Sequence, residues 1–214
     1  MKPRLLIIGA GGHARVVISI ARRMGTWDLI GVLAREAPTA YEQIDGVPLI
    51  GPYADAARLH GEGVTQAALA IGDNTERASK LAGLAQLGFN FPVLQHPSAL
   101  IEDNATLGDG TVVCAGAIIG AQVMIGRNVI INTGAILDHE TVVGDHAHIA
   151  PGCRVAGRVR IGEGTLLGIG TCVREKIDIG AQSLIGAGSV VVDDIPGAVV
   201  AYGCPARVAR SLQP

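Results

Sequence analysis

Residues 101–196 divide without a gap into sixteen consecutive blocks of six residues, and every block begins with Ile, Leu or Val. The fifth residue of each block is small or β-branched, and the fourth is glycine or a polar residue throughout. Positions 1 and 5 therefore suit the interior of stacked strands, and position 4 suits a turn. Because a turn every six residues leaves no room for a helix, the repeat predicts a parallel β-helix. With three faces per coil, each coil takes eighteen residues.

The region before the repeat alternates apolar strands with amphipathic helices. A strand, a glycine turn and a helix are predicted over residues 4–25, and the alternation continues to about residue 88. This pattern predicts a small parallel α/β unit. Pro92 and Pro97 discourage regular structure in the link to the repeat. We therefore expect domains at 1–92 and 93–196, followed by a C-terminal arm at 197–214 that ends in a small helix.

Composition excludes several classes of partner. The net charge is −2 and the chain has no basic cluster, so neither nucleic acid nor membrane insertion is expected. The N-terminus lacks the features of a secretory signal, which predicts a cytoplasmic protein. The four cysteines stand singly without CxxC spacing, as reduced thiols do.

The glycine turn at 9–14 matches the G-x-G-x-x-[GA] pattern between a strand and a helix. Backbone N–H groups at such a turn favour a phosphate or pyrophosphate, so a nucleotide diphosphate is the expected ligand. An NAD-type site is a weaker interpretation, because the second strand ends in Ala34-Arg35-Glu36 rather than in a ribose-binding acid. A plain tight turn is the third. His13 either contacts the ligand or caps the helix.

A second candidate functional site lies within the repeat, where three of the six histidines fall within ten residues. His139 and Glu140 occupy positions 3 and 4 of their block, so both are expected to project outward at a corner. A carboxylate beside an imidazole fixes its tautomer and raises its basicity, as a general base requires. Asn132 and Asp138 replace the common glycine at position 2 nearby. The alternative interpretation is a set of solvated surface histidines.

A catalytic zinc site is a further alternative, with His139, His146 and His148 as its ligands. These residues occupy positions 3, 4 and 6 of their blocks, which face different directions. We therefore predict no metal site.

Several motifs occur together in a fixed order: GAGGH at 9–13, AIGDN at 70–74, HPSA at 96–99, INTGAILDHE at 131–140 and GCPAR at 203–207. In this set the chain resembles the bacterial sugar acyltransferases of the sialic acid O-acetyltransferase type, which include N-acetyltransferases of UDP-4-amino sugars. The resemblance implies a homotrimer with a left-handed β-helix and a Rossmann-like N-terminal unit that binds the nucleotide of the sugar. Acetyl-CoA is the implied co-substrate, bound along the prism between two subunits.

The resemblance also implies residue roles. His139 is similar to the family's general base, and Glu140 to the acid that strengthens it. Acetyl-CoA is expected at His148, Ile169 and Ala187. The nucleotide-linked amino sugar is expected at Gly11, Gly12, His13 and Gly72.

One departure from the family concerns Ala34 and Arg35. Relatives that bind UDP often carry aspartates here, so the nucleobase stays open. The function expected from the sequence is N-acetylation of a nucleotide-linked amino sugar for surface glycans. The alternatives are O-acetylation of a sialic acid or related sugar, and a non-catalytic protein that binds sugar nucleotides.

Overall fold

The computed structural model describes residues 1–38 and 42–212, which form two compact units, Met1–Pro97 and Ser98–Pro214. Each unit is described by itself below. In the part of the chain that is described, no helix has the length and apolar character needed to cross a membrane.

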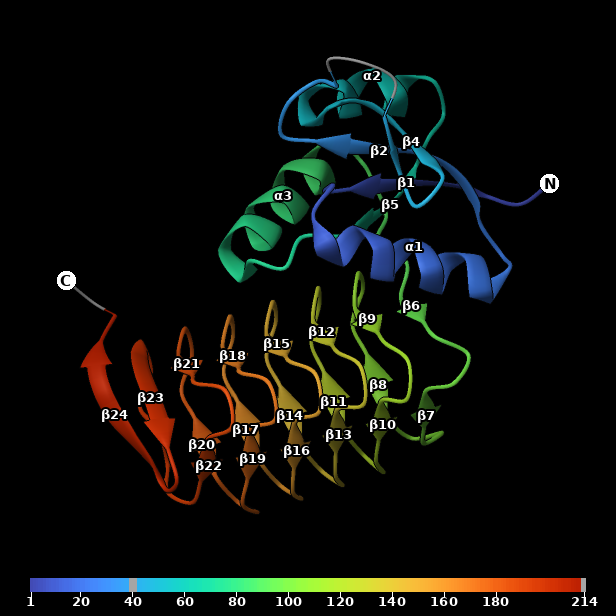
Figure 1. Ribbon diagram of the computed structural model, residues 1–214. Helices are drawn as coiled ribbons and strands as arrows, with labels where there is room; N and C mark the ends of the chain where they lie inside the picture. The colour runs from blue at the N-terminus through green and yellow to red at the C-terminus, as the bar shows by residue number, and fades with distance from the viewer. Residues whose placement is uncertain (39–41, 213–214) are drawn as a thin grey trace. The chain divides into compact units, whose positions relative to one another are not determined.

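The N-terminal unit is a five-stranded sheet with helices, as the sequence predicts (Figure 1). The sheet order is β3-β4-β2-β1-β5, with β1, β2, β4 and β5 parallel and β3 antiparallel to β4. Its elements are β1 (Arg4–Ile8), α1 (Gly12–Met24), β2 (Asp28–Ala34), β3 (Gln43–Ile44), β4 (Val47–Pro52), η1 (Tyr53–Asp55), α2 (Ala56–Gly61), β5 (Gln66–Leu69), α3 (Asn74–Gln86) and β6 (Leu94–Gln95). The short strand β6 lies in the link that the prolines predict to be irregular.

The second unit is the left-handed parallel β-helix expected from the repeat. Within the repeat the strands are two residues long, six residues apart, and formed by positions 6 and 1 of successive blocks. Strand pairs are offset by eighteen residues, as in Ile118 with Ile136, which confirms three faces per coil.

Three sheets form these faces. The β10 sheet contains β7 (Leu100–Ile101), β10 (Ile118–Ile119), β13 (Ile136–Leu137), β16 (Arg154–Val155), β19 (Cys172–Val173) and β22 (Val190–Val191). The β8 sheet contains β8 (Thr106–Leu107), β11 (Met124–Ile125), β14 (Val142–Val143), β17 (Arg160–Ile161) and β20 (Asp178–Ile179). Within this unit the β9 sheet contains β9 (Val112–Val113), β12 (Ile130–Ile131), β15 (His148–Ile149), β18 (Leu166–Leu167), β21 (Leu184–Ile185), β23 (Val199–Gly203) and β24 (Ala206–Ser211).

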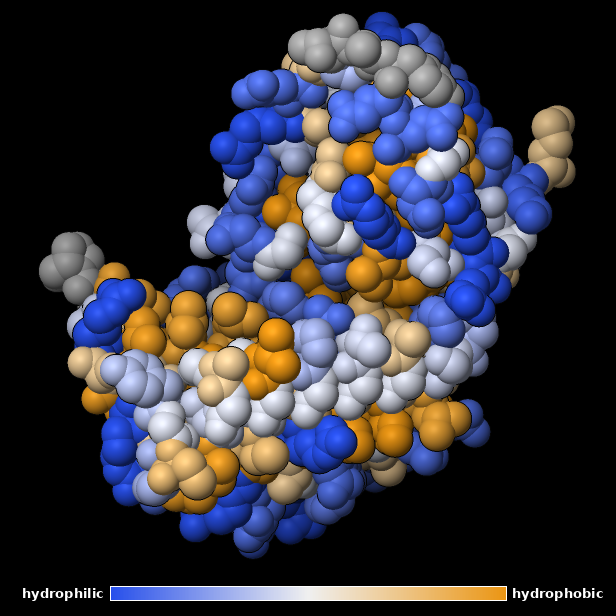
Figure 2. Space-filling model, viewed as in Figure 1, coloured by the Kyte–Doolittle hydropathy of each residue, from blue (hydrophilic) through white to orange (hydrophobic). Residues whose placement is uncertain are grey.

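The repeat positions divide between inside and outside as expected. Block-initial residues such as Ile119, Ile131 and Leu137 are fully buried, and each such side chain contributes roughly 1.5–3 kcal/mol through burial. Position 6 is exposed or partly exposed in most strands, as at Leu100 and Ile118 on the β10 sheet, whereas Val112 and Ile130 on the β9 sheet are buried. Figure 2 shows apolar side chains exposed on this unit beside polar ones.

The C-terminal arm corrects one expectation. Residues 199–211 form a β-hairpin rather than a small helix, with β23 paired in parallel to β21 and β24 paired antiparallel to β23. The last coil of a β-helix exposes unpaired backbone groups, and a strand satisfies them where a helix does not.

Candidate active site

The four residues predicted to bind the sugar nucleotide lie together in the N-terminal unit. Gly11, Gly12, His13 and Gly72 line one cavity of about 340 Å³ at the carboxyl ends of β1 and β5. A second hollow of about 480 Å³ shares Ala10, Gly11, Tyr53 and Glu76 with it and extends to Arg35. Parallel α/β sheets bind their ligands at the carboxyl ends of their strands.

The glycines of the turn serve different purposes. Gly9 has φ +114°, and a Cβ there would lie 2.8 Å from the carbonyl oxygen of Ala70, so the turn itself requires glycine. At Gly11, Gly12 and Gly72 a Cβ would meet nothing within 4 Å. Crowding inside the unit therefore does not explain these three glycines, and the open space beside them leaves their backbone accessible.

His13 does not cap α1, because the cap residue is Gly11 and no side chain bonds to the cap. The Nε2 atom of His13 is buried and has no hydrogen-bond partner in the described chain. Burial, aided by the charge of Arg77, lowers the pKa of His13 to about 4. The ring is therefore neutral near pH 7.

Arg77 is a residue that the sequence analysis missed. Its side chain is 1% exposed and holds the 71–74 loop through the carbonyl oxygens of Ile71 (3.2 Å) and Gly72 (3.3 Å) and the Oδ1 atom of Asn74 (2.8 Å). Burial lowers the pKa of Arg77 to about 10, so the side chain stays charged at neutral pH. An arginine in the first turns of a helix usually faces solvent, and no signal in the sequence marked this one as buried.

Arg35 also lies at this edge. Its Nη2 atom is 3.2 Å from Oε1 of Glu76, and the arginine side chain is largely exposed. In this pair Arg35 lies just after β2, at the position where relatives that bind UDP often carry aspartates.

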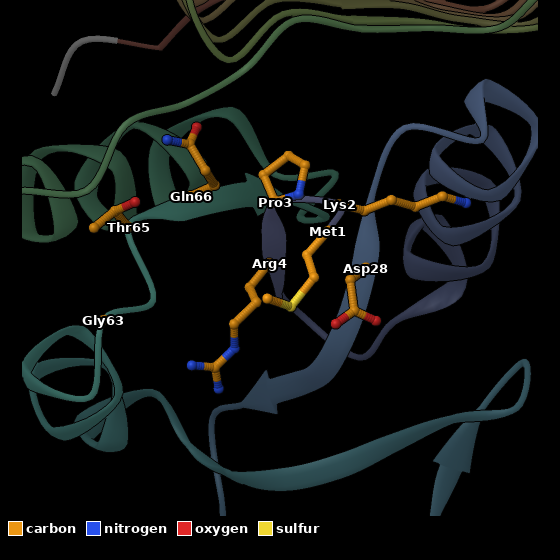
Figure 3. A pocket seen from close by; sticks show the side chains of 8 residues that line it. All are labelled: Met1, Lys2, Pro3, Arg4, Asp28, Gly63, Thr65 and Gln66. Carbon is orange, nitrogen blue, oxygen red and sulfur yellow. The ribbon is translucent and has the colours of Figure 1, made fainter.

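A further cavity of about 580 Å³ lies at the opposite edge of the sheet, at the amino ends of β1, β2 and β5 (Figure 3). It is lined by Met1, Lys2, Pro3, Arg4, Asp28, Gly63, Thr65 and Gln66. This edge has neither the glycine turn nor a helix N-terminus, so we do not assign the nucleotide to it.

In the β-helix, every position-4 residue from Gly110 to Gly188 has a positive φ and forms a corner of the coil. We call the stack of turns that contains Gln122, Glu140, Arg158 and Lys176 the His139 corner; it joins the β10 and β8 sheets. We call the stack that contains Gly116, Gly134, Gly152, Gly170 and Gly188 the glycine corner; it joins the β9 and β10 sheets.

His139 and Glu140 project outward together, as their register predicts. The side chains are 51% and 41% exposed, and His139 Nδ1 lies 3.0 Å from Glu140 Oε2. Because an ionised carboxylate can only accept, the bond places the proton on Nδ1, which donates to Glu140. In the neutral ring Nε2 therefore presents a free lone pair. Hydrogen bonds from Arg158 and from His139 lower the pKa of Glu140, which keeps it ionised.

The turn beneath His139 is shaped to receive its ring. Gly157 lies one coil further on, and a Cβ there would be 2.5 Å from both Cε1 and Nε2 of the imidazole. Asp138 Oδ1 accepts the main-chain N–H of His139 at 2.7 Å. The His139 ring is thus fixed by contacts from its own turn and from the next coil.

The predicted acetyl-CoA residues occupy a different part of the prism. His148 lies on the β9 sheet, where its Nε2 is 3.1 Å from Asn132 Nδ2. Ile169 and Ala187 stack at the glycine corner, and the Gly188 N–H donates to the Ile169 carbonyl at 2.7 Å. One face of the prism, the β10 sheet, separates this corner from His139.

The histidines weighed as zinc ligands do not converge. His146 Nδ1 lies 2.8 Å from Asn128 Nδ2 at the third corner, whereas His139 bonds to Glu140 and His148 to Asn132. Among the described residues, no group of three or more His, Cys, Asp or Glu side chains is placed to hold a metal ion.

Comparisons with known proteins identify relatives of the chain. Residues 4–84 match the PglD N-terminal domain. A structure of perosamine N-acetyltransferase from Caulobacter crescentus, a histidine-to-asparagine variant in complex with CoA and GDP-perosamine, is 36% identical, with 97% of each chain covered and a TM-score of 0.92. The acetyltransferase domain of PglB from Neisseria gonorrhoeae, in complex with acetyl coenzyme A, is also 36% identical over 97% of this chain and 100% of that one, with a TM-score of 0.91. The chain belongs to this family of sugar acetyltransferases.

A further member of the comparison shows the fold alone. WeeI from Acinetobacter baumannii is 19% identical, with 97% of this chain and 100% of that chain covered and a TM-score of 0.73. The comparison with curated proteins found no match. As a sugar acetyltransferase, the chain is an acetyl-CoA-dependent enzyme.

Proposed function

We propose that the protein transfers the acetyl group of acetyl-CoA to the amino group of a nucleotide-linked amino sugar, with His139 as the general base. The observation that carries the proposal is the exposed His139–Glu140 pair, whose bond leaves Nε2 free to accept a proton. The relatives with bound GDP-perosamine and acetyl coenzyme A support the acceptor and donor classes. A cytoplasmic location is favoured by four cysteines that are all free.

The reaction needs two proton transfers, one to His139 and one from it. The sugar amine attacks the thioester carbonyl while His139 Nε2 removes a proton from the nitrogen. The tetrahedral intermediate then breaks its carbon–sulfur bond, and the imidazolium returns the proton to the departing thiolate. Main-chain N–H groups of a neighbouring subunit stabilise the oxyanion. Glu140 holds the tautomer throughout and stabilises the imidazolium.

The nucleotide of the acceptor binds in the cavity lined by Gly11, Gly12, His13 and Gly72. Backbone N–H groups at the start of α1 suit its phosphates, and the open space at the three glycines lets it approach. The relative that binds GDP-perosamine, together with Arg35 at the end of β2, makes guanosine diphosphate as plausible a carrier as uridine diphosphate.

The donor lies along the glycine corner, where His148, Ile169 and Ala187 contact it. At the five glycines of this corner a Cβ would meet nothing within 4 Å, so intrachain crowding does not require them. Their φ values, 64° to 69°, do not require glycine either, because Gln122, Glu140 and Lys176 adopt 57° to 59° elsewhere. A bare strip of backbone along four coils fits an extended donor such as the pantetheine arm.

The protein acts as a homotrimer. Within one protomer the glycine corner and the His139 corner lie at opposite edges of the β10 sheet. Transfer therefore takes place at a seam, where one subunit's glycine corner meets His139 of the next subunit. Exposed apolar residues on the β-helix, among them Leu100, Met124 and Ile169, supply surface for such contacts.

The test is a panel of GDP- and UDP-linked 4-amino sugars, with hydroxyl sugars alongside, assayed with acetyl-CoA by release of free thiol. We expect turnover with at least one amino sugar, and an amide product by mass spectrometry. His139→Ala should lower kcat/KM about 10²- to 10⁴-fold. An unchanged kcat/KM in this variant removes His139 as the base, and an ester product from a hydroxyl sugar alone contradicts N-acetylation.

A further inference from the structure

Glu140 accepts a second hydrogen bond in addition to the one from His139. The Nε atom of Arg158 lies 2.7 Å from Glu140 Oε2, the same oxygen that lies 3.0 Å from His139 Nδ1. Arg158 follows Glu140 by eighteen residues, so the two side chains stack at the His139 corner. The main-chain N–H of Arg158 also donates to the His139 carbonyl oxygen at 2.9 Å. The coil register therefore places a guanidinium directly against the carboxylate that orients the base.

The ion pair does little for stability. The side chains of Arg158 and Glu140 are 54% and 41% exposed, and exposed pairs of this kind contribute little to folding. A contact that is this short, specific and weakly stabilising, and that touches the base's partner, points to a role in the reaction.

The charges around His139 are few. In its own turn it has Asp138 and Glu140, and in the next coil it has Arg158. The preceding coil presents the uncharged Ala121 and Gln122, while Glu175 and Lys176 lie one coil beyond Arg158. Arg158 is thus the cation closest to the His139–Glu140 pair.

A carboxylate at Nδ1 acts on an imidazole in two ways. It fixes the proton on Nδ1, which a base at Nε2 needs, and it stabilises the protonated ring, which cannot act as a base. A guanidinium on the same carboxylate oxygen offsets the second effect electrostatically. It leaves the hydrogen bond that produces the first effect in place.

We propose that Arg158 is a positioning residue that holds Glu140 against His139 and offsets its charge, so that the carboxylate fixes the Nδ1 proton without its full stabilisation of the protonated ring. This inference rests on the proposed role of His139. Hydrogen bonding from Arg158 also lowers the pKa of Glu140, which keeps the carboxylate in its accepting form.

The experiment compares pH profiles of kcat/KM for the full-length protein and its variants. In Arg158→Met the acid limb should move to higher pH by about half a unit to one unit, because the imidazolium gains stability. The plateau above this limb should be retained. Glu140→Gln should move the limb in the opposite direction, and Arg158→Lys should restore the original profile in part. Arg127→Met, which removes a comparable pair with Asp145 at the third corner, is the matched control and should not move the limb.

A direct titration of the His139 ring by NMR, without substrates, should show the same shift in Arg158→Met. An unshifted or downward-shifted limb and ring titration in Arg158→Met and Arg158→Gln overturns the inference. A lower plateau with an unchanged limb also overturns it, since that result indicates a purely structural contact. If His139→Ala keeps full activity, the proposed function fails; if it is inactive while Arg158→Met is unshifted, only this inference fails.

Discussion

At the scale of single residues, the position of the His139 ring depends on the absence of a side chain at position 157 in the next coil. The His139 ring occupies the space that a side chain at position 157 would fill. The repeat register places His139 and Glu140 at a corner from the sequence alone, since position 4 is a turn in every block. It does not reveal Gly157 or Arg158 as partners, because the register places residues at a corner but rotamers decide which side chains touch.

Gly157→Ala should therefore displace the imidazole. A methyl group 2.5 Å from Cε1 and Nε2 forces the ring to move by about 1 Å, and misplacement of this size costs up to about 10²-fold in rate. We expect kcat/KM to fall by about tenfold or more while the melting temperature changes little. Gly83→Ala in α3, where a Cβ meets nothing within 4 Å, is the control and should keep its activity. Equal activity in the two variants would show that the ring does not rest on Gly157.

At the scale of elements, the sequence predicts those whose pattern is local. β1, α1, β2, β5 and α3 follow from apolar runs, the glycine turn and amphipathic spacing. The C-terminal hairpin was predicted wrongly as a helix, because pairing with the exposed edge of β21 is a non-local contact that local propensity does not report. Arg77, which ties α3 to the loop after β5, was missed for a different reason: its contacts are local, but nothing in the sequence marks this arginine as buried.

The stability of the fold depends on pH through His13, which lies in the first turn of α1. His13 has a pKa of about 4 in the folded protein against 6.5 when exposed. Above pH 6.5 the ring is neutral in both states. As the pH falls below 6.5 the unfolded chain takes up a proton that the folded chain does not, so folding stability is lost, by up to about 2 kcal/mol at pH 5.

The measurement is the difference in the free energy of unfolding between the natural protein and His13→Asn at pH 7, 6 and 5. The natural protein's advantage should shrink steadily toward pH 5, because the asparagine does not titrate. A difference that stays constant across this range would mean that His13 is accessible to protons in the folded state.

At the scale of the whole molecule, the three corners of the β-helix differ in what they present to solvent. One corner has Glu140 and Arg158, the third has Asn128 and His146, and the glycine corner has no side chain at position 4 along its length. The repeat hides this difference when it is read in blocks of six. It becomes visible only when the blocks are sorted by eighteen.

Gly170→Asn tests whether acetyl-CoA binds along the glycine corner. Asparagine tolerates φ near +60°, and the space around Gly170 is open, so the free energy of unfolding should change by less than about 1 kcal/mol. The KM for acetyl-CoA should rise about tenfold or more, while the KM for the sugar nucleotide stays nearly constant. Gln182→Asn places the same side chain at the same turn position of the third corner and should leave both constants unchanged. A normal KM for acetyl-CoA in Gly170→Asn would remove the donor from this corner.

The eighteen-residue offset between paired strands also restricts how the gene can change. Insertion of one codon, unless the added residue loops out at a corner, would shift every later buried position by one and turn its side chain away from the interior. Duplication of a whole coil of eighteen codons preserves every inward and outward assignment. The length of this enzyme is therefore free to vary mainly in whole coils, and each added coil would lengthen all three corners together by one strand spacing, about 4.8 Å.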